Sequence, residues 1–268
     1  MLQCGITGHK GNLGKTFLKE NKKFHFIKFK GDISKKKDIN LWIKNNHFDL
    51  MVHFAAIVPT NVVNKNYQKA IKVNFKGTKY LIDEIIRQKK NIKWFFFSSS
   101  SHVYKMKRNK INEKSPKIPS SKYGKTKLLA ENYIIKKLKK SNIKYCIGRI
   151  FSIYDNKEKN FLIPNLLKKI NQKEKKIIFD NLNHYRDFLT TSQISQIIFF
   201  LWKKRYQGII NIGSGIKINI ELIAQKFATK LNKKISFNKN RPTFLIADNS
   251  KLKKIGYNKK NLKLKSFF

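Results

Sequence analysis

The chain has 268 residues, 41% of them hydrophobic, which exceeds the usual size of one small domain and allows a sizeable core. Its longest apolar run, Ile194 to Trp202, is shorter than the roughly 18 residues that a membrane-spanning helix needs and suits a buried helix. The formal net charge of +45 at pH 7 would ordinarily suggest nucleic acid or an anionic membrane surface as a partner.

The pattern of the basic residues argues against a dedicated nucleic-acid protein. They are spread along the chain and nearly all are lysine. Proteins that read bases rely on arginine for bidentate contacts, so a nucleic-acid function is not favoured. The excess of Lys, Ile, Asn and Phe is typical of a general amino-acid bias, and a basic surface also suits a phosphorylated substrate.

The first residues and the cysteines indicate the compartment. Met1 to Thr7 runs straight into a strand-like pattern without a signal-peptide pattern. Cys4 and Cys146 both lie in apolar strand-like runs, which is typical of buried thiols in a reducing compartment. We therefore expect a cytoplasmic protein without disulfides, and no metal site is predicted.

A glycine-rich turn follows the first apolar run. Leu2 to Ile6 leads into TGHKGNLG, Thr7 to Gly14, and the residues after the turn have a helical pattern. In such a unit Gly8 permits a tight turn, Gly11 lets the backbone approach a pyrophosphate, and Gly14 lets the helix pack closely. The N–H groups at the helix start would bind the phosphates. The alternative is an ordinary glycine-bearing loop.

The second predicted strand, Phe24 to Phe29, ends among basic residues. A carboxylate at this tip would bind the ribose hydroxyls of NAD and repel the extra phosphate of NADP. The tip carries Lys28 and Lys30 instead, which favours NADP slightly. Asp32 follows late, where it could meet the adenine edge or cap the helix that begins near Lys36.

The third predicted strand lies in DLMVHFAA, Asp49 to Ala56, and its small last residues would let a cofactor lie against the backbone. His53 within it is interpreted as a core histidine with satisfied hydrogen bonds. The next segment, Asn64 to Lys89, is predicted to be helical, with Asn74 near its middle. Asn is a poor residue inside a helix, so Asn74 either faces solvent or has a bonding partner inside.

The fourth predicted strand, Ile92 to Phe97, runs directly into four serines, Ser98 to Ser101. Hydroxyls at the carboxyl end of a parallel strand lie where doubly wound sheets bind ligands. Further on, Tyr123 and Lys127 are four positions apart and would share one helix face. An ammonium beside a phenol stabilises the phenolate, so this pair could exchange a proton near neutral pH. The spacing alone is also compatible with a surface helix.

These pieces together resemble the extended short-chain dehydrogenase/reductase family, the NAD(P)-dependent epimerases, dehydratases and reductases of nucleotide sugars. The matching segments are TGHKGNLG, Asp32, HFAA at 53 to 56, VNFKGT with Asn74, SSSSHVY, and YGKTK with Tyr123. They occur in family order with family spacings over roughly the first 155 residues. Several weak motifs in one register make a strong signal.

The resemblance implies roles for individual residues. Tyr123 would be the acid/base, Lys127 would lower its pKa while binding the nicotinamide ribose, and Ser100 would steady the developing alkoxide, with Ser99 as the fallback. Asn74 would stiffen the region around Lys127. The implied cofactor-binding residues are Gly8, Lys10, Gly11, Asn12, Leu13, Gly14, Asp32, Ile33, Phe54, Ala55, Ala56, Asn74, Tyr123 and Lys127.

The second half of the chain resembles the family more loosely. HYRDFLTT, His184 to Thr191, resembles the segment whose arginine contacts the substrate diphosphate, which implies this role for Arg186, and Arg241 is a second candidate. The implied substrate-binding residues are Ser100, Ser101, His102, Asn165, Arg186 and Arg241.

The expected fold is α/β, a Rossmann-type doubly wound parallel sheet with a smaller C-terminal α/β substrate lobe. Residues 1–154 would form the NAD(P)-binding domain and residues 155–268 mainly the substrate lobe, with about 186–215 returning to the Rossmann sheet. A homodimer through Lys69 to Lys89 and Lys127 to Lys139 is compatible with the pattern.

The expected function is an NAD(P)-dependent nucleotide-sugar oxidoreductase. The short stretch between Phe24 and Asp49 resembles the trimmed cofactor side of 4-keto-6-deoxysugar reductases, so a 4-keto reductase is preferred. A 4-epimerase with retained NAD, which needs only the Tyr123 machinery, is the alternative. An alternative of another class is a non-catalytic dinucleotide- or RNA-binding protein on the same fold.

Overall fold

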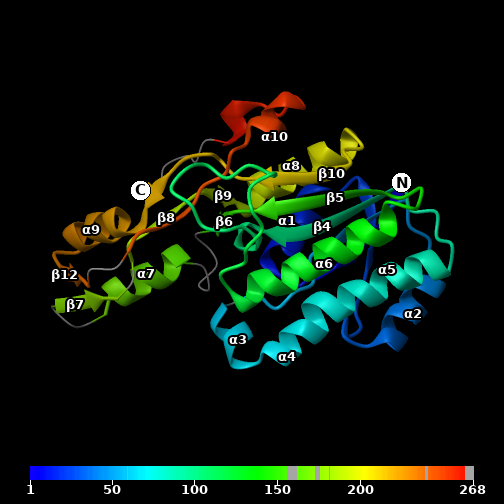
Figure 1. Ribbon diagram of the computed structural model, residues 1–268, viewed down its shortest axis with the longest axis horizontal. Coiled ribbons are helices and arrows are strands. Elements are labelled where there is room, and N and C mark those ends of the chain that lie inside the picture. The colour runs from blue at the N-terminus through cyan, green and yellow to red at the C-terminus, as the bar shows by residue number, and fades with distance from the viewer. Residues whose placement is uncertain (59, 156–161, 173–175, 181, 239–240, 263–268) are drawn as a thin grey trace. The chain divides into compact units, whose positions relative to one another are not determined.

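The computed structural model describes residues 1–58, 60–155, 162–172, 176–180, 182–238 and 241–262. They belong to two compact units, whose elements are labelled in Figure 1. The first unit consists of Met1–Lys105, Glu113–Ile150 and Ser192–Ile210, and the second of Met106–Asn112, Phe151–Thr191 and Asn211–Phe268.

The first unit is built on a six-stranded sheet in the order β10-β5-β4-β3-β1-β2. Its strands are β1 (Leu2–Thr7), β2 (Phe24–Lys28), β3 (Leu50–His53), β4 (Trp94–Ser100), β5 (Lys144–Ile150) and β10 (Gly208–Ile212). The pairs β1–β2, β1–β3, β3–β4 and β4–β5 are parallel, which confirms the predicted wound sheet. The strand order reverses at β1, and ligands bind such sheets outside the carboxyl ends of the strands at this reversal.

Helices cover both faces of this sheet. One face carries α2 (Lys36–Lys44), α5 (Gly77–Arg87) and α6 (Lys122–Leu138), and the other carries α1 (Asn12–Glu20) and α8 (Thr191–Lys203). The shorter helices are α3 (Thr60–Lys65), α4 (Tyr67–Ala70), the π-helix η1 (Ile71–Lys76) and the 3-10 helix η2 (Ser101–Val103). The helix predicted from Asn64 to Lys89 is therefore interrupted: Asn66 follows the end of α3 and caps α4 by accepting from Lys69 N, at 2.9 Å.

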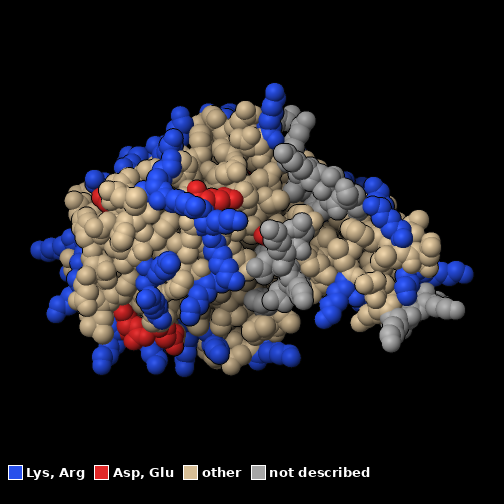
Figure 2. Space-filling view, turned by 180° about the vertical axis from the view of Figure 1, so that it is seen from behind, with Lys and Arg blue, Asp and Glu red and all other residues tan. Residues whose placement is uncertain are grey.

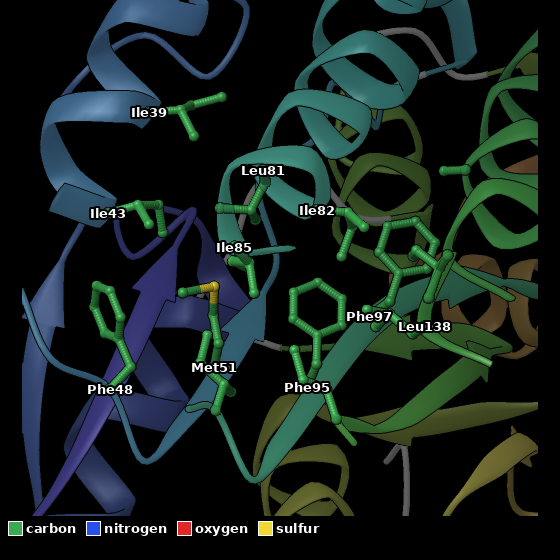
Figure 3. Close-up of a cluster of buried hydrophobic side chains, with 14 of the residues drawn as sticks. Ile39, Ile43, Phe48, Met51, Leu81, Ile82, Ile85, Phe95, Phe97 and Leu138 are labelled. Carbon is green, nitrogen blue, oxygen red and sulfur yellow. The ribbon is translucent and has the colours of Figure 1, made fainter. Parts of the chain in front are cut away.

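The larger core of this unit lies between the sheet and α2, α5 and α6 (Figure 3). It brings together Ile39 and Ile43 of α2, Leu81, Ile82 and Ile85 of α5, Leu138 of α6, and the strand residues Met51, Phe95 and Phe97. Successive strand residues face opposite sides of a sheet, so Phe96 belongs to the other core. There it contacts Phe54, which in turn contacts Phe17 of α1. β4 therefore contributes side chains to the cores on both faces of the sheet, close to its carboxyl end.

The second unit contains several small sheets. Its strands are β6 (Ser152–Tyr154), β7 (Lys176–Phe179), β8 (His184–Arg186), β9 (Phe188–Thr190), β11 (Ile218–Asn219), β12 (Lys234–Phe237) and β13 (Thr243–Leu245). They pair as β11-β8-β13, β12-β7 and β6-β9. The helices are α7 (Leu162–Ile170), α9 (Ile220–Lys230), α10 (Ser250–Lys254) and the 3-10 helix η3 (Lys259–Leu262). In the core of this unit, Leu166 of α7 and Ile223 of α9 pack with Phe179 and Phe188.

A buried carboxylate organises the turns of the second unit. Asp187 accepts hydrogen bonds from Ser214 N and Oγ, from Gly215 N and from Ala247 N at 2.6–3.0 Å. A Cβ atom on Gly213 would lie 2.7 Å from the Asp187 carboxylate, so only glycine fits beside it. The Asp of the HYRDF segment therefore stabilises the NIGSG turn, Asn211 to Gly215, in which Gly213 and Ser214 lie.

The surface is dominated by positive charge. On the face shown in Figure 2, Lys and Arg side chains are scattered widely, whereas Asp and Glu gather in a few spots. Three of the acidic side chains, Glu84, Glu131 and Asp187, are buried and so do not offset the surface charge. No helix among the described residues is long and apolar enough to cross a membrane. The apolar run Ile194 to Trp202 lies instead in α8, with Ile194 and Leu201 fully buried.

Candidate active site

The glycine turn has the geometry of a phosphate cradle. Gly8 has a φ of +70° and a Cβ there would lie 2.5 Å from Ala55 N, so this position requires glycine. A Cβ on Gly14 would lie 2.3 Å from Gly8 O, so the start of α1 packs too closely on the turn for any residue but glycine. On Gly11, by contrast, a Cβ would meet only Gly8 O at 3.4 Å. Packing within the protein therefore does not require a glycine at position 11. The open space beside Gly11 suits a ligand that approaches the backbone closely.

The start of α1 offers donors to that ligand. Gly11 is the N-cap residue and no side chain caps the helix, and the first turn contains no acidic residue. The first N–H groups of a helix, which include those of Asn12 and Leu13, have no partners within the helix and carry the positive end of its dipole. Together with the space beside Gly11, these donors fit the pyrophosphate of a dinucleotide.

Basic side chains surround the outer edge of this turn. The positive charges of Lys10, Lys28 and Lys30, after burial, lower the pKa of His9, which shows that all three lie near one point. Asp32 is exposed, and its carboxylate accepts hydrogen bonds from Ser34 N at 2.8 Å and Ser34 Oγ at 2.7 Å. Asp32 therefore orders the turn before α2, although the N-cap residue of that helix is Lys35.

His53 is a core residue, as predicted. Both ring nitrogens have partners: Nδ1 lies 2.6 Å from Thr7 Oγ1 and Nε2 lies 2.9 Å from Thr78 Oγ1. Thr78 Oγ1 donates to Asn74 O at 2.8 Å, so it accepts from Nε2–H, and Nδ1 accepts from Thr7. Burial lowers the pKa of His53 to about 3, which keeps the ring neutral. The chain of bonds ties the ends of β1 and β3 to η1.

Asn74 has a bonding partner inside, one of the two alternatives that the sequence left open. Its Oδ1 accepts from Ile57 N at 2.7 Å, and its Nδ2 donates to Ile57 O at 3.0 Å and to Thr126 Oγ1 at 3.1 Å. Thr126 lies next to Lys127, and its hydroxyl donates to Tyr123 O at 2.8 Å. Asn74 therefore connects the loop after β3 to the first turns of α6.

The end of β4 and the start of α6 bring three predicted residues together. Tyr123 is 7% exposed and forms a hydrogen bond with the Ser100 side chain. Lys127 is 2% exposed, and its Nζ donates to Ser98 O at 2.8 Å. The Ser99 hydroxyl donates to Glu131 instead. Between the two serines that the sequence offered as partners of Tyr123, the geometry favours Ser100.

The ionisation of this group differs from the expectation. Burial raises the pKa of Tyr123 above its usual range, and the hydrogen bond with Ser100, rather than Lys127, lowers it. Lys127 Nζ lies 6.0 Å from the centre of the Tyr123 ring and is bonded to Ser98 O. Burial also lowers the pKa of Lys127 to about 7, with the charge of Glu131 acting in the opposite direction. Lys127 is therefore only partly charged at neutral pH.

Replacing Lys127 should stabilise the fold. A lysine titrates near pH 10.4 in an unfolded chain and near 7 here, so burying the ammonium costs stability below pH 7, and the cost fades between pH 7 and 10.4. We expect Lys127→Met to raise the free energy of unfolding by about 1–3 kcal/mol at pH 6 and by much less at pH 10. Urea denaturation at both pH values measures this, with the exposed Lys125→Met as control. If Lys127→Met changed the free energy of unfolding by the same amount at pH 6 and at pH 10, the prediction would be contradicted.

The turn after β4 packs against α6. The Ser121 side chain caps α6 by accepting from Gly124 N at 3.1 Å, and it lies 3.4 Å from His102 Nδ1. The His102 ring stands edge-on to the Tyr123 ring, with their centres 5.9 Å apart. His102 therefore lies beside Tyr123, whereas Ser101 is buried within η2.

The remaining predicted cofactor residues of the first unit contact one another or the core. Ala55 N donates to Thr7 Oγ1 at 3.3 Å, while Phe54 packs on Phe17 and Ile33 belongs to the large core. Ala56 is half-buried beside them.

The predicted substrate residues of the second unit lie on separate elements. Arg186 on β8 is half-buried, and its guanidinium donates to Thr243 Oγ1 at 3.0 Å, Thr243 O at 3.1 Å and Tyr185 O at 2.9 Å. Burial lowers its pKa to about 10. Arg241 and Asn165, the latter on α7, are exposed. Arg186 is thus held in one orientation by β13, whereas the other two are exposed to solvent.

Sequence reasoning missed two residues of the site, Glu131 and Arg149. Both are fully buried, and they form an ion pair with Arg149 Nη2 2.6 Å from Glu131 Oε2. Two signals could have indicated them: an arginine inside the apolar strand CIGRI, and an acid four positions after Lys127 on the same helix face. A charge in a buried strand requires a partner. Among the described residues no group of His, Cys, Asp and Glu could hold a metal ion.

Comparisons with known proteins agree with this geometry. The family model for the NAD dependent epimerase/dehydratase family matches residues 5–213. A UDP-glucose 4-epimerase from Lactobacillus helveticus is 30% identical over 52% of this chain and 45% of its own. A dTDP-4-dehydro-6-deoxyglucose reductase from Escherichia coli is 25% identical over 74% of this chain and 64% of its own. The chain thus spans about half to two thirds of the length of these curated relatives.

Solved structures share the fold. The structure of RMD from Pseudomonas aeruginosa, complexed with NADPH, superposes with a TM-score of 0.83 at 16% identity, covering 95% of this chain and 92% of the other. The glycine turn, the wound parallel sheet and the Ser100–Tyr123–Lys127 group lie within the matched residues. The chain therefore belongs to the NAD dependent epimerase/dehydratase family.

Proposed function

We propose that the chain is an NAD(P)-dependent oxidoreductase of nucleotide sugars, and specifically a 4-keto reductase. The observation that carries this proposal is the hydrogen bond between Ser100 and Tyr123, with Lys127 one helical turn further along α6. Relatives named as a UDP-glucose 4-epimerase and a dTDP-4-dehydro-6-deoxyglucose reductase supply the substrate class. The short connection from β2 to β3, with the single helix α2, supports a reductase.

In the proposed reaction, a bound nicotinamide supplies the hydride. Tyr123 donates its phenolic proton to the oxygen at C4 of the sugar, because burial keeps this phenol protonated at neutral pH, where its pKa is raised. Ser100 donates a hydrogen bond to the same oxygen and so stabilises the negative charge that develops on it. In its charged form, Lys127 would stabilise the remaining phenolate, since its Nζ lies 6.0 Å from the centre of the Tyr123 ring.

The lysines around the glycine turn support NADP as the cofactor. The positive charges of Lys10, Lys28 and Lys30 all lower the pKa of His9 in this turn, which supports a positively charged surface near the proposed site of the adenosine ribose. A 2′-phosphate would be attracted to such a group. We expect Lys28→Glu/Lys30→Glu to lower the preference for NADPH over NADH, measured as the ratio of kcat/KM values, about 10- to 100-fold.

The exposed Lys22→Glu at the other end of β2 is the matched control, since it changes the net charge without touching the turn. Equal loss of activity with both cofactors, or an unchanged ratio, would contradict the assignment.

The most direct test is turnover on a panel of nucleotide sugars. The proposal expects NADPH consumption with at least one 4-keto sugar nucleotide, and no consumption by Tyr123→Phe. Consumption that is independent of Tyr123, or none with any sugar, would refute the reductase.

A 4-epimerase is the second candidate, favoured by the 30% identity to a UDP-glucose 4-epimerase. It would use the same Tyr123 group but would hold NAD permanently. Purified protein distinguishes the two: NAD that stays bound through dialysis, with interconversion of C4 epimers and no net cofactor consumption, indicates an epimerase.

A candidate of another class is a dinucleotide- or RNA-binding protein without activity, since a net charge of +45 attracts phosphate groups of any kind. Salt-sensitive RNA affinity that survives Tyr123→Phe, together with no turnover, would support it. The intact pair of Ser100 and Tyr123 argues for catalysis, because a binding protein does not need the phenol.

We also propose a homodimer through α5 and α6, which contact each other and carry the exposed apolar residues Ile86 and Leu129. Light scattering at several salt concentrations tests this. The buried thiols of Cys4 and Cys146 support a reducing compartment, and we propose the cytoplasm.

A further inference from the structure

The end of β4 is joined to α6 by three consecutive residues. Ser98 accepts from Lys127 through its carbonyl, the Ser99 hydroxyl donates to Glu131, and Ser100 bonds to Tyr123. Positions 123, 127 and 131 are four apart and share one face of the helix. The strand end is therefore held along two turns of α6, and Ser99 forms the middle link.

The middle link leads to a fully buried ion pair. Glu131 and Arg149 are both 0% exposed, and Arg149 bonds to both carboxylate oxygens, with Nε 3.0 Å from Oε1 and Nη2 2.6 Å from Oε2. In the ladder of β4 and β5, Arg149 pairs directly with Ser99. One carboxylate on α6 thus accepts hydrogen bonds from both strands.

The guanidinium of Arg149 is held from its other side as well. Its Nη1 donates to Tyr104 OH at 2.8 Å and to Glu113 O at 3.3 Å, and its carbon lies 4.6 Å from the centre of the Tyr104 ring. Tyr104, which ends the turn after β4, therefore belongs to the same buried group as Ser99, Glu131 and Arg149.

An ion pair in this position is costly for stability alone. Removing two charges from water is expensive, and well-packed apolar residues in such a place are often equally stable or more stable. A reason other than stability is therefore needed, and the neighbours of Ser99 supply one. Ser98 and Ser100 are the residues that contact Lys127 and Tyr123, and a shift of about 1 Å in such a group can cost about 100-fold in rate.

We propose that Ser99, Glu131 and Arg149 are positioning residues of the Tyr123 site: they fix the end of β4 against α6 and thereby hold Ser100 on Tyr123 and Ser98 on Lys127. This inference deepens the proposed function and rests on it for the reacting groups. None of the three touches the substrate in this proposal; they act through their neighbours.

The first test removes only the middle link. Ser99→Ala leaves the side chains of Glu131, Arg149, Ser100 and Tyr123 chemically unchanged and removes only the hydroxyl that holds the strand end. We expect kcat to fall about 10- to 100-fold with an almost unchanged KM for the sugar. Ser99→Thr keeps a hydroxyl and should restore at least a third of the lost rate. The matched control is Ser195→Ala, a fully buried serine whose hydroxyl instead accepts from Asn21 Nδ2 at 3.1 Å. It should keep the wild-type kcat.

The second test removes the charges. Single replacements leave one buried charge unpaired and can unfold the chain, so the variant is Glu131→Leu/Arg149→Met. We expect it to fold with a melting temperature at or above that of the wild type, yet to lose kcat at least as severely as Ser99→Ala. Because Glu131 raises the pKa of Lys127, its removal should also move the alkaline limb of the pH–rate profile to lower pH.

Failure of this inference can be told from failure of the proposed function. Dinucleotide affinity, measured by calorimetry between pH 6 and 9, serves as a readout without turnover: the wild type and Ser195→Ala should bind equally, and Ser99→Ala about 3- to 10-fold more weakly. If no sugar is turned over but these dinucleotide affinities are found, the proposed reaction is wrong and the positioning role is supported. A folded Ser99→Ala or double variant with wild-type kcat, affinity and pH profile would overturn the positioning role, and so would a wild type that binds no dinucleotide.

Discussion

Tyr123→Phe should abolish turnover while leaving the fold and dinucleotide binding intact. The phenol is the acidic side chain that the described site brings against Ser100, and general acid catalysis of this kind contributes about 100- to 10,000-fold in rate. The replacement removes one hydroxyl from a buried ring, which costs about 1 kcal/mol of stability through the lost hydrogen bond. Steady-state kinetics and thermal melting measure the two effects separately.

The same helix provides the control for this experiment. Tyr133 also lies on α6, and its hydroxyl donates to Asp83 on α5, away from Ser100. Tyr133→Phe should therefore lose a comparable hydrogen bond and keep its kcat. If Tyr123→Phe retained more than a tenth of the wild-type rate, the phenol would not be the acid.

Gly124→Ala should impair both activity and stability. A Cβ at Gly124 would lie 2.1 Å from His102 O and 2.8 Å from His102 C, and backbone atoms cannot move aside as a flexible side chain can. The start of α6 would have to separate from η2, and Tyr123 would move with it away from Ser100. We expect a destabilisation of about 1–3 kcal/mol and a fall in kcat of at least about 100-fold.

Urea denaturation and kinetics on the soluble fraction measure this pair of effects. Lys125→Ala, on the exposed neighbour, adds no contact with the turn and should change neither quantity by much. A Gly124→Ala variant with normal kcat would show that η2 and α6 need not touch for the site to work.

The sequence predicted the parts of this site that depend on local signals. The glycine turn, the strand-like runs and the Tyr123–Lys127 spacing are each readable from a few adjacent residues, and their common register identified the fold. The resemblance preferred Ser100 and kept Ser99 as the fallback, because two adjacent serines in a run look alike until the strand is placed against α6. Only the hydrogen bonds to Glu131 and to Tyr123 separate them.

Other contacts could not be predicted because they join residues that are far apart in the sequence. The ion pair between Glu131 and Arg149 joins residues of α6 and β5, and the two bonds of His53 join β1 to α5. Such contacts depend on how helices and strands pack against one another, which cannot be predicted from the local pattern of a single sequence. The causes of the Tyr123 pKa shift include burial and Ser100 but not the expected lowering by Lys127, because burial also lowers the pKa of Lys127 and so reduces its charge.

The scattered lysines of Figure 2 have a consequence for how this protein must be handled. With 60 basic against 15 acidic residues, and several of the acids buried, like charges on the surface repel one another and oppose compaction. Added electrolyte shortens the reach of that repulsion to about 8 Å at 0.15 M and about 3 Å at 1 M. The melting temperature should therefore climb as sodium chloride is raised from about 0.02 to about 0.5 M, and dilute buffers are the condition under which this protein should be weakest.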